Sequence, residues 1–282
     1  MRYRIGGIYR EDAYLSDHAG NDLKIFNLTA DSLQKWGFEI TRYSESEFLQ
    51  ADIKENLIFS MARTSEVIEK LQILEEKGVV VVNSTQGVGN CVRDKMTTLL
   101  LANKVPHPES SIVLTDDFLL TDKIDIQRSY WIKRGDSHVS QRDDVVYVRT
   151  SNEAENALKA LSSRGILKAV ICEHLIGDII KFYGVRDSNF FYWFYPDQSH
   201  SKFGLEKING KPQGISFDLD VLKKIAQDSA NILDVDIYGG DCVIDKYGTI
   251  KIIDFNDWPS FAPCRDEAAV HIANYIKGKL KI

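Results

Sequence analysis

One stretch near the C-terminal end, residues 240–261 (GDCVIDKYGTIKIIDFNDWPSF), constrains the fold most. It contains two apolar runs, CVI and IKII, separated by a polar turn at 245–248. We expect an antiparallel strand pair, which places the start of one strand beside the end of the other. Asp241 opens the first strand, and Asp254 and Asn256 close the second. Because side chains alternate along a strand, these three polar side chains should lie together on one face.

Two carboxylates and an amide oxygen are the kind of ligand that Mg²⁺ prefers, and protein-bound Mg²⁺ usually also contacts substrate phosphates. The stretch therefore predicts a metal site made by Asp241, Asp254 and Asn256. An ordinary hairpin with acidic residues at its exposed ends explains the same pattern. The stretch alone does not decide between these two interpretations.

Length and charge limit the possible functions. A chain of 282 residues buries a large core and exceeds the usual size of one domain, so we expect two or three lobes. It carries 35 basic and 41 acidic residues, a net charge of −6, which argues against a general nucleic-acid or membrane binder. An anionic ligand must then be held by a local cluster of basic side chains.

The sequence also predicts where the protein works. Residues 1–15 lack an apolar core of signal-peptide length, and no stretch approaches the ~18 apolar residues of a membrane span. We therefore expect a cytoplasmic protein with a small-molecule substrate and no nucleic-acid or membrane partner; whether it is a monomer or a homodimer stays open. Its cysteines lack CxxC spacing, which favours reduced thiols over disulfides or zinc.

The N-terminal part predicts a parallel α/β unit. Apolar runs at 56–63 and 79–84 flank a segment whose Val67, Leu71 and Leu74 recur at helical spacing. Arg63 then follows the carboxyl end of a strand, where open α/β sheets bind ligands. A solvated arginine at a helix start is the alternative.

The remaining patterns predict an α+β middle section and a C-terminal sheet. A helix over 93–103 should end before Pro106, because proline disfavours the α conformation in the residue before it. Further expected elements are strands at 110–114, 130–133, 145–150, 169–177, 179–185 and 190–195, helices at 152–163, 217–233 and 265–277, and a ligand loop at 197–214.

The order of these parts resembles the ATP-grasp superfamily over nearly the whole chain. The motifs are RDKMTTLLLANKVPHPES, YWIKRGD, ICEHLIGDIIKFY and GGDCVID…IIDFNDWPSF. The resemblance implies an α/β fold with α+β lobes and ATP held between two of them. It implies a Rossmann-like pre-ATP-grasp domain over 1–90, a central small lobe over 91–178 and a C-terminal lobe with the metal site over 179–282.

The resemblance also implies an ATP site. Lys95 and Lys133 match the two lysines that hold ATP phosphates, which suits a compact ammonium charge. Glu173 and Leu175 match hinge positions whose backbone meets adenine, and Asp178 matches the acid near the ribose. The alternatives, in which these residues have structural roles without a ligand, are an edge-strand lysine at 133, a surface helix lysine at 95 and a buried, paired carboxylate at 173.

The same resemblance makes Asp241, Asp254 and Asn256 the Mg²⁺ ligands, so the expected cofactors are ATP and Mg²⁺. Departures from the common pattern lie nearby. The loop 134–142 has a single glycine where most members have a glycine-rich loop, and no arginine occurs at 188–264, where carboxylate-activating members commonly place one. Ligase-type members usually carry glutamate at the position of Asp254.

These departures resemble the inositol trisphosphate kinase branch. His138 matches a histidine after the second lysine, and Lys181 matches a lysine on the strand after the hinge. Asp254 and Asn256 fit the branch's DxNxxPG motif, although Ser260 stands in place of its glycine. This interpretation predicts transfer of the γ-phosphoryl group of ATP to a small phosphorylated polyol, with Lys133, His138 and Lys181 as catalytic residues.

Two alternatives remain. FSMAR and VVNSTQGV in the N-terminal half resemble ligases that join glutamate to a protein or small-molecule amine, which predicts an ADP-forming carboxylate–amine ligase working through an acyl-phosphate. An ATP-binding regulatory pseudoenzyme is the third possibility, although both metal acids and both lysines are present.

Several basic side chains from separate segments suit an anionic acceptor, while Arg142 and Arg186 are expected at the solvated surface. The candidate substrate-binding residues are Arg10, Arg63, His138, Lys181, His200, Lys202 and Asn256. We also expect the central lobe, about 107–178, to close over ATP, and the loops 134–144 and 197–214 to become ordered with ligands.

Overall fold

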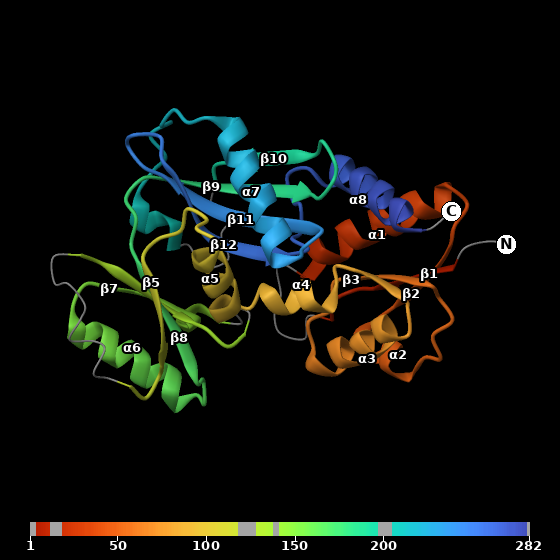
Figure 1. Ribbon diagram of the computed structural model, residues 1–282, viewed down its shortest axis with the longest axis horizontal. Coiled ribbons are helices and arrows are strands. Elements are labelled where there is room, and N and C mark those ends of the chain that lie inside the picture. The colour runs from red at the N-terminus through yellow and green to blue at the C-terminus, as the bar shows by residue number, and fades with distance from the viewer. Residues whose placement is uncertain (1–3, 12–18, 118–127, 138–140, 197–204, 281–282) are drawn as a thin grey trace.

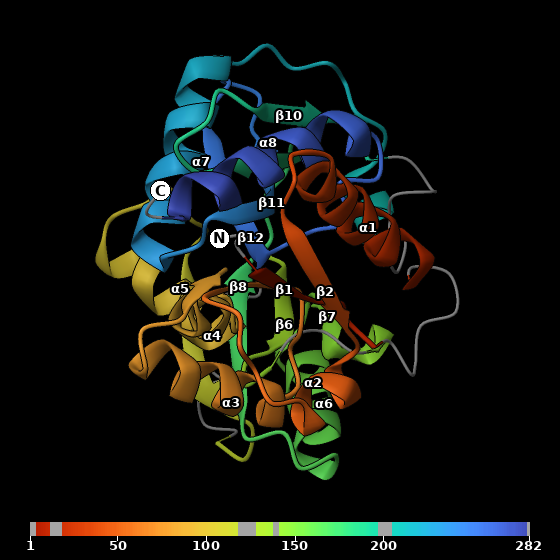
Figure 2. The same ribbon diagram turned by 90° about the vertical axis from the view of Figure 1, so that its right-hand side faces the viewer.

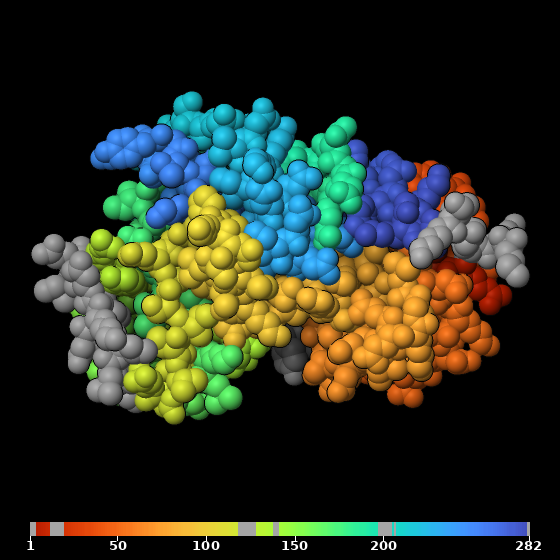
Figure 3. Space-filling model, viewed as in Figure 1, coloured from red at the N-terminus to blue at the C-terminus, as the bar shows by residue number. Residues whose placement is uncertain are grey.

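The protein is described by a computed structural model that covers residues 4–11, 19–117, 128–137, 141–196 and 205–280. The described chain forms three four-stranded sheets with helices against them (Figure 1). Figure 3 shows the yellow-to-green central part and the orange N-terminal part as two bodies that lie beneath the cyan-to-blue C-terminal part. This arrangement leaves a junction between the central and C-terminal parts, where the candidate site lies.

The N-terminal sheet is parallel, with strand order β2-β1-β3-β4. Its strands are β1 (Arg4–Ile8), β2 (Glu39–Tyr43), β3 (Leu57–Ser60) and β4 (Val80–Val82). Its helices are α1 (Ala19–Lys35), α2 (Glu45–Gln50), α3 (Ser65–Glu76) and α4 (Thr85–Asn90). Every residue of β3 is buried, as expected for a strand covered on both faces. The parallel unit predicted over 56–84 is confirmed.

The central sheet is antiparallel, with strand order β5-β8-β6-β7. It consists of β5 (Ser110–Leu114), β6 (Tyr130–Arg134), β7 (Val145–Val148) and β8 (Lys168–Glu173). The helix α6 (Ser151–Ser163) packs Ala154, Leu158 and Leu161 against it. One helix on a small antiparallel sheet is the α+β arrangement that the sequence predicts.

The C-terminal sheet is also antiparallel, with strand order β10-β9-β11-β12. Its strands are β9 (Asp178–Val185), β10 (Phe191–Phe194), β11 (Ile237–Ile244) and β12 (Ile250–Asp257). Two helices, α5 (Arg93–Ala102) and α7 (Leu219–Leu233), share an apolar cluster with it that includes Met96, Leu100, Leu222 and Phe255. The helix α5, which the sequence groups with the central lobe, therefore packs on the C-terminal sheet.

The last helix, α8 (Arg265–Lys279), returns to the N-terminal part and lies beside α1 (Figure 2). Its Ile272 and Ile276 share a core cluster with Phe26 and Leu33 of α1. The predicted boundaries at 90 and 178 stay predictions; each sheet lies within one of the three ranges, except that β9 begins at Asp178, the last residue of the second range. No described helix combines the length and apolar character needed to span a bilayer.

Candidate active site

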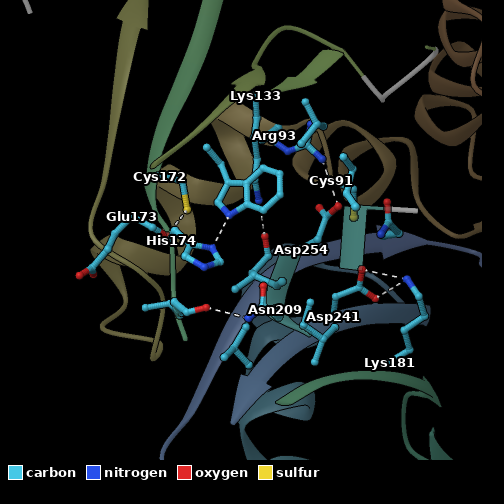
Figure 4. Close-up of a pocket in the computed structure, with 18 of the residues that line it drawn as sticks. Cys91, Arg93, Lys133, Cys172, Glu173, His174, Lys181, Asn209, Asp241 and Asp254 are labelled. Carbon is cyan, nitrogen blue, oxygen red and sulfur yellow. Dashed lines mark hydrogen bonds and ion pairs between the residues drawn. The ribbon is translucent and has the colours of Figure 1, made fainter. Parts of the chain in front are cut away.

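A cavity of about 350 Å³ lies between the central and C-terminal sheets (Figure 4). Its walls come from β6 and β8 on one side and from β9, β11 and β12 on the other. The first turn of α5, the 3-10 helix η3 (Leu205–Asn209) and the segment that joins β8 to β9 complete it. A cavity between two lobes is a common position for a ligand site.

The β11–β12 hairpin supplies the acidic wall. The turn is closed by the Asp245 carboxylate, which accepts hydrogen bonds from the amides of Tyr247 (2.8 Å) and Thr249 (2.9 Å). The strand β11 begins at Ile237, so Asp241 lies within the strand and not, as expected from the sequence, at its start. A register shift between Asp241 and Cys242 places Asp241 directly opposite Asp254. Both side chains line the cavity, as does that of Asn256. The hairpin thus brings together the three residues that the sequence singles out.

These three side chains fit a bound Mg²⁺. They offer two carboxylates and an amide oxygen on one wall. The described residues contain no cluster of three or more His, Cys, Asp or Glu side chains suited to a metal. Mg²⁺ commonly takes only one or two carboxylates and completes its octahedron with water and phosphate oxygens, so this small donor set suits it better than it suits zinc.

Basic side chains face the acidic wall. The Lys181 Nζ lies 3.0 Å from both carboxylate oxygens of Asp241, and Arg93 Nη2 lies 3.0 Å from Asp254 Oδ2. Burial raises the pKa of Asp254, but the charges of Arg93, Lys133 and Lys181 outweigh burial and lower it below its ordinary value. The Asp254 carboxylate is therefore ionised at neutral pH, as a metal ligand must be.

Lys133 reaches the cavity because of its place on β6. Ile132 points into the core under α6, so its neighbours Trp131 and Lys133 point to the opposite face. Lys133 is 9% exposed, and its Nζ donates to the backbone carbonyl of Ile253 on β12 at 3.1 Å. An edge-strand lysine in solvent does not describe this side chain, which spans the two lobes.

The hinge segment after β8 lines the cavity with Glu173, His174 and Leu175. The Glu173 amide donates to the carbonyl of Glu109 at 2.9 Å. The Leu175 carbonyl accepts from Asn209 Nδ2 at 2.8 Å, which docks η3 onto the hinge.

An aromatic group lies beside the hinge. Trp131 Nε1 donates to His174 Nδ1 at 3.0 Å, and Tyr147 packs edge-on against the same imidazole at 5.1 Å between ring centroids. Burial lowers the pKa of His174, which keeps the ring neutral and able to accept that hydrogen bond. Trp131 and His174 both line the cavity and give this end flat, largely apolar walls that suit a heteroaromatic ring.

Two expected ATP-binding residues lie elsewhere. Lys95 is exposed on α5 and does not line the cavity. Asp178 is 3% exposed, and its carboxylate accepts from the amides of Gln213 (2.8 Å) and Ile215 (2.9 Å). The Asp178 carboxylate therefore holds the segment before α7, and the structure does not bring it together with the other candidate residues.

The expected acceptor residues divide similarly. Arg63 lines the cavity, and its Nη2 contacts Asp257 Oδ1 at 2.8 Å. Arg10 lies behind it, 2.6 Å from Asp22 and 4.0 Å from Asp257, and does not line the cavity. Arg142 is exposed, as expected. Arg186 is not a solvated surface residue, because only 17% of its side chain is exposed and it pairs with Asp234 and Asp236. The candidates outside the described residues are His138, His200 and Lys202.

Sequence reasoning missed several cavity residues. Arg93 is the first residue of α5, two positions before Lys95, and it is 7% exposed. The RDK motif carries both cations but does not say which one faces inward. Others not identified from sequence are Cys91, Trp131, His174 and Asn209. His174 lies within the motif ICEHLIGDIIKFY, so its place at the hinge could be predicted from the sequence. Its contact with Trp131 could not.

Solved structures with very different sequences share this fold. The D-alanine–D-alanine ligase from Bacillus anthracis, complexed with ATP, has a TM-score of 0.67 at 13% identity, over 98% of this chain and 96% of that chain. A RimK domain ATP-grasp protein from Sphaerobacter thermophilus has a TM-score of 0.68 at 14% identity, over 98% and 100%. The D-alanine–D-alanine ligase from Coxiella burnetii has a TM-score of 0.69 at 11% identity, over 99% and 98%.

The sequence comparisons find nothing comparable: no family model and no curated protein matches the chain. The likeness to the solved structures extends over whole chains on both sides, so it covers all three sheets and the cavity between two of them. At such low identities a likeness of this kind concerns the fold, and the chemistry must be argued from the residues of this chain.

Proposed function

From the ATP-grasp fold of this chain, which confirms the resemblance of its motifs, we propose that the protein is a Mg²⁺-ATP-dependent enzyme that joins a carboxylate to an amine and releases ADP. The observation that carries the proposal is the cavity between the lobes. Two facing carboxylates, Asp241 and Asp254, lie there beside the ammonium groups of Lys133 and Lys181. This is the chemistry that a metal-bound triphosphate requires.

The nucleotide would lie along the cavity with its base at the hinge. Trp131, His174 and Leu175 offer flat and apolar contacts there. The phosphates would reach Lys133 and Lys181, whose charges balance the negative charge that develops during transfer. Asp241, Asp254 and Asn256 would hold Mg²⁺, which when bound would supply positive charge to neutralise the phosphates.

Arg63 is our candidate for the acid substrate. Its Nε and Nη2 contact the two carboxylate oxygens of Asp257 at 3.3 and 2.8 Å, so its plane is fixed before any substrate arrives. Arg63 lines the cavity, and 24% of its side chain is exposed. A preorganised guanidinium orients a carboxylate with little loss of entropy.

The proposed reaction has two steps. A carboxylate oxygen of the substrate attacks the γ-phosphorus, the bond from that phosphorus to the β,γ-bridging oxygen breaks, and ADP leaves. An amine then attacks the acyl carbon, phosphate leaves with the bonding electron pair, and the amine proton passes to solvent. Closure of the lobes over the nucleotide would exclude water and protect the acyl-phosphate until the amine enters.

Phosphoryl transfer to a hydroxyl group is the second candidate. Among the described residues, the cavity is lined by four cations, Arg63, Arg93, Lys133 and Lys181, which suits an acceptor that is itself phosphorylated. Asp254 in place of glutamate also resembles the kinase branch. Among the solved structures with this fold, the D-alanine–D-alanine ligases support the carboxylate chemistry proposed for this chain, and the inositol phosphate kinase interpretation stays a prediction.

Hydroxylamine trapping tests the proposal. Incubation with MgATP, a panel of amino acids and dicarboxylic acids, and hydroxylamine should give equal amounts of ADP and a hydroxamate, because hydroxylamine intercepts an acyl-phosphate. Incubation with inositol phosphates should release no ADP. Phosphate that stays on a hydroxyl acceptor, with no hydroxamate, would establish the kinase, and tight ATP binding without any turnover would favour the pseudoenzyme.

A further inference from the structure

Arg93, which the sequence motifs did not identify, lies at the point where the two lobes meet the acidic wall. We propose that Arg93 is a positioning residue that holds the Asp254 carboxylate in the orientation in which it binds Mg²⁺. This inference rests on the proposed MgATP site. It assigns to Arg93 a role through Asp254 and no contact of its own with the nucleotide.

The Asp254 carboxylate is held at both oxygens. Arg93 Nη2 contacts Oδ2 at 3.0 Å, and the amide of Phe255 donates to Oδ1 at 3.1 Å. A carboxylate has about four lone-pair positions, so each oxygen keeps one for a metal ion. Ligating carboxylates are commonly fixed by such hydrogen bonds, which set their direction before the metal arrives.

Arg93 is itself fixed from the other lobe. Its Nη1 donates to the carbonyl of Arg134, at the end of β6, at 3.3 Å. The first turn of α5 is tied to the same place, since the Asp94 amide donates to the Gly135 carbonyl at 3.0 Å and Lys168 pairs with the Asp94 carboxylate at 2.8 Å. Arg93 therefore connects the central lobe to the carboxylate on β12.

The chemistry of this contact requires an arginine. A guanidinium presents several N–H groups in a rigid plane and can bond a carbonyl and a carboxylate at once, whereas an ammonium is a single compact charge. The Arg93 side chain is 8% exposed, and its buried Nε has no hydrogen-bond partner among the described residues. The fold thus keeps this side chain in place although one of its donors is unsatisfied, which costs stability.

A competing explanation predicts the opposite change in metal affinity when Arg93 is replaced. If Arg93 only neutralises Asp254 while no metal is bound, it competes with Mg²⁺, and removing its positive charge should tighten metal binding. If Arg93 positions Asp254, its removal should weaken metal binding despite the loss of a nearby repulsive charge. The direction of the change in metal affinity therefore separates the two.

The test measures Mn²⁺ binding, as a probe for Mg²⁺, by electron paramagnetic resonance of free Mn²⁺ in the presence of a non-hydrolysable ATP analogue. We expect Arg93→Met to weaken Mn²⁺ binding by about 10- to 100-fold. Arg93→Lys, which keeps the charge but cannot reach both partners, should weaken it as well. Unchanged or tighter Mn²⁺ binding in Arg93→Met, or wild-type binding in Arg93→Lys, would overturn the proposal.

A double-mutant cycle shows whether the effect runs through Asp254. In an Asp254→Asn background, Arg93→Met should cause no further loss of Mn²⁺ affinity; an equal further loss would mean a merely structural role and would overturn the proposal. Lys159→Met is the control, because it removes an exposed positive charge that pairs with Glu155 on α6 and does not line the cavity, and it should bind Mn²⁺ normally.

The Asp254→Asn variant separates this inference from the proposed function. If Asp254→Asn weakens Mn²⁺ binding but Arg93→Met does not, the metal site stands and the role of Arg93 is wrong. If Asp254→Asn itself leaves Mn²⁺ binding unchanged, the metal site is wrong and the role of Arg93 is wrong with it.

Discussion

Lys133 shows how a single side chain joins the two lobes. The side chain extends from β6 of the central sheet, and its Nζ donates to the Ile253 carbonyl on β12. It lines the cavity between the acidic wall and the hinge. We predict that Lys133→Met lowers the turnover number for ADP release by on the order of 100-fold or more, because a preorganised charge beside the phosphates is lost. Lys159→Met, on the exposed surface of α6, is the control and should turn over ATP at the wild-type rate.

His107 predicts a pH dependence of stability. Burial lowers the pKa of His107 from 6.5 to about 4, and its Nδ1 donates to the Pro108 carbonyl at 2.9 Å. The folded state therefore keeps the ring neutral, while the unfolded state binds a proton below about pH 6.5. Between about pH 6.5 and pH 4 the unfolded state binds more protons, so stability is lost as the pH falls through this window.

Between pH 6.5 and pH 4 the decrease in the free energy of unfolding attributable to His107 reaches about 3 kcal/mol. Urea unfolding at pH 7 and pH 4.5 measures it, with His107→Gln as the comparison, because a side chain that does not titrate removes this contribution. An equal pH dependence in both proteins would contradict the assignment.

The basic residues of α5 show the limit of sequence reasoning at this scale. Residues two positions apart on a helix lie roughly 200° apart around its axis, so Arg93 and Lys95 cannot both face the cavity. The RDK motif names both, and only tertiary structure decides that Arg93 faces inward. The sequence predicts that Asp241 lies near Asp254, but their direct pairing depends on a register shift between Asp241 and Cys242. The register set by the turn, which pairs Cys242 with Ile252, would otherwise place Asp241 opposite Ile253.

At the scale of the element, the β11–β12 hairpin depends on a close approach at Gly240. A Cβ added there would lie 2.6 Å from the Asp254 carbonyl oxygen and 2.5 Å from the Phe182 ring. The backbone oxygen cannot move without shifting β12, so we predict that Gly240→Ala destabilises the protein by about 1–3 kcal/mol. Urea unfolding followed by circular dichroism measures this.

The control for that substitution is Gly278→Ala. Gly278 lies in α8 with nothing within 4 Å of an added Cβ, so alanine should be neutral or stabilise the helix by up to about 1 kcal/mol. If Gly240→Ala were as stable as Gly278→Ala, the contact between β11 and β12 would be looser than described.

Elements whose apolar residues recur at a clear helical or strand spacing were predicted well, but the helix α1 was not predicted. The sequence predicts α8 over 265–277, and the structure has it over Arg265–Lys279. In α1 the buried face includes a polar residue, Thr29, among Ile25, Phe26, Ala30 and Leu33. This mixed stripe gives a weaker apolar signal, although its spacing is helical.

At the scale of the molecule, helices near the two ends of the described chain pack against each other. The helix α8 packs against α1, so residues near both ends of the chain share one core. The sequence could not predict this contact, because nothing local in either helix specifies its partner. The N-terminal sheet therefore depends for its stability on the last helix of the chain.

We predict that Ile272→Ala destabilises the protein by about 2–5 kcal/mol, because Ile272 is fully buried in this shared core. Hydrogen exchange of the amides of β1 and β3 should accelerate in the same variant. Val270→Ala, at a 44% exposed position of the same helix, should change neither. Faster exchange confined to α8 would mean that the N-terminal sheet does not depend on it.

The central claim is that the cavity between the lobes binds one MgATP. Isothermal titration calorimetry with a non-hydrolysable ATP analogue and Mg²⁺ tests it most directly, with the wild-type protein and a Lys133→Met/Asp254→Asn double variant. We predict one bound nucleotide per chain for the wild type and an affinity weaker by at least about 100-fold for the double variant. Equal affinities in the two proteins, or no binding to the wild type, would contradict the claim.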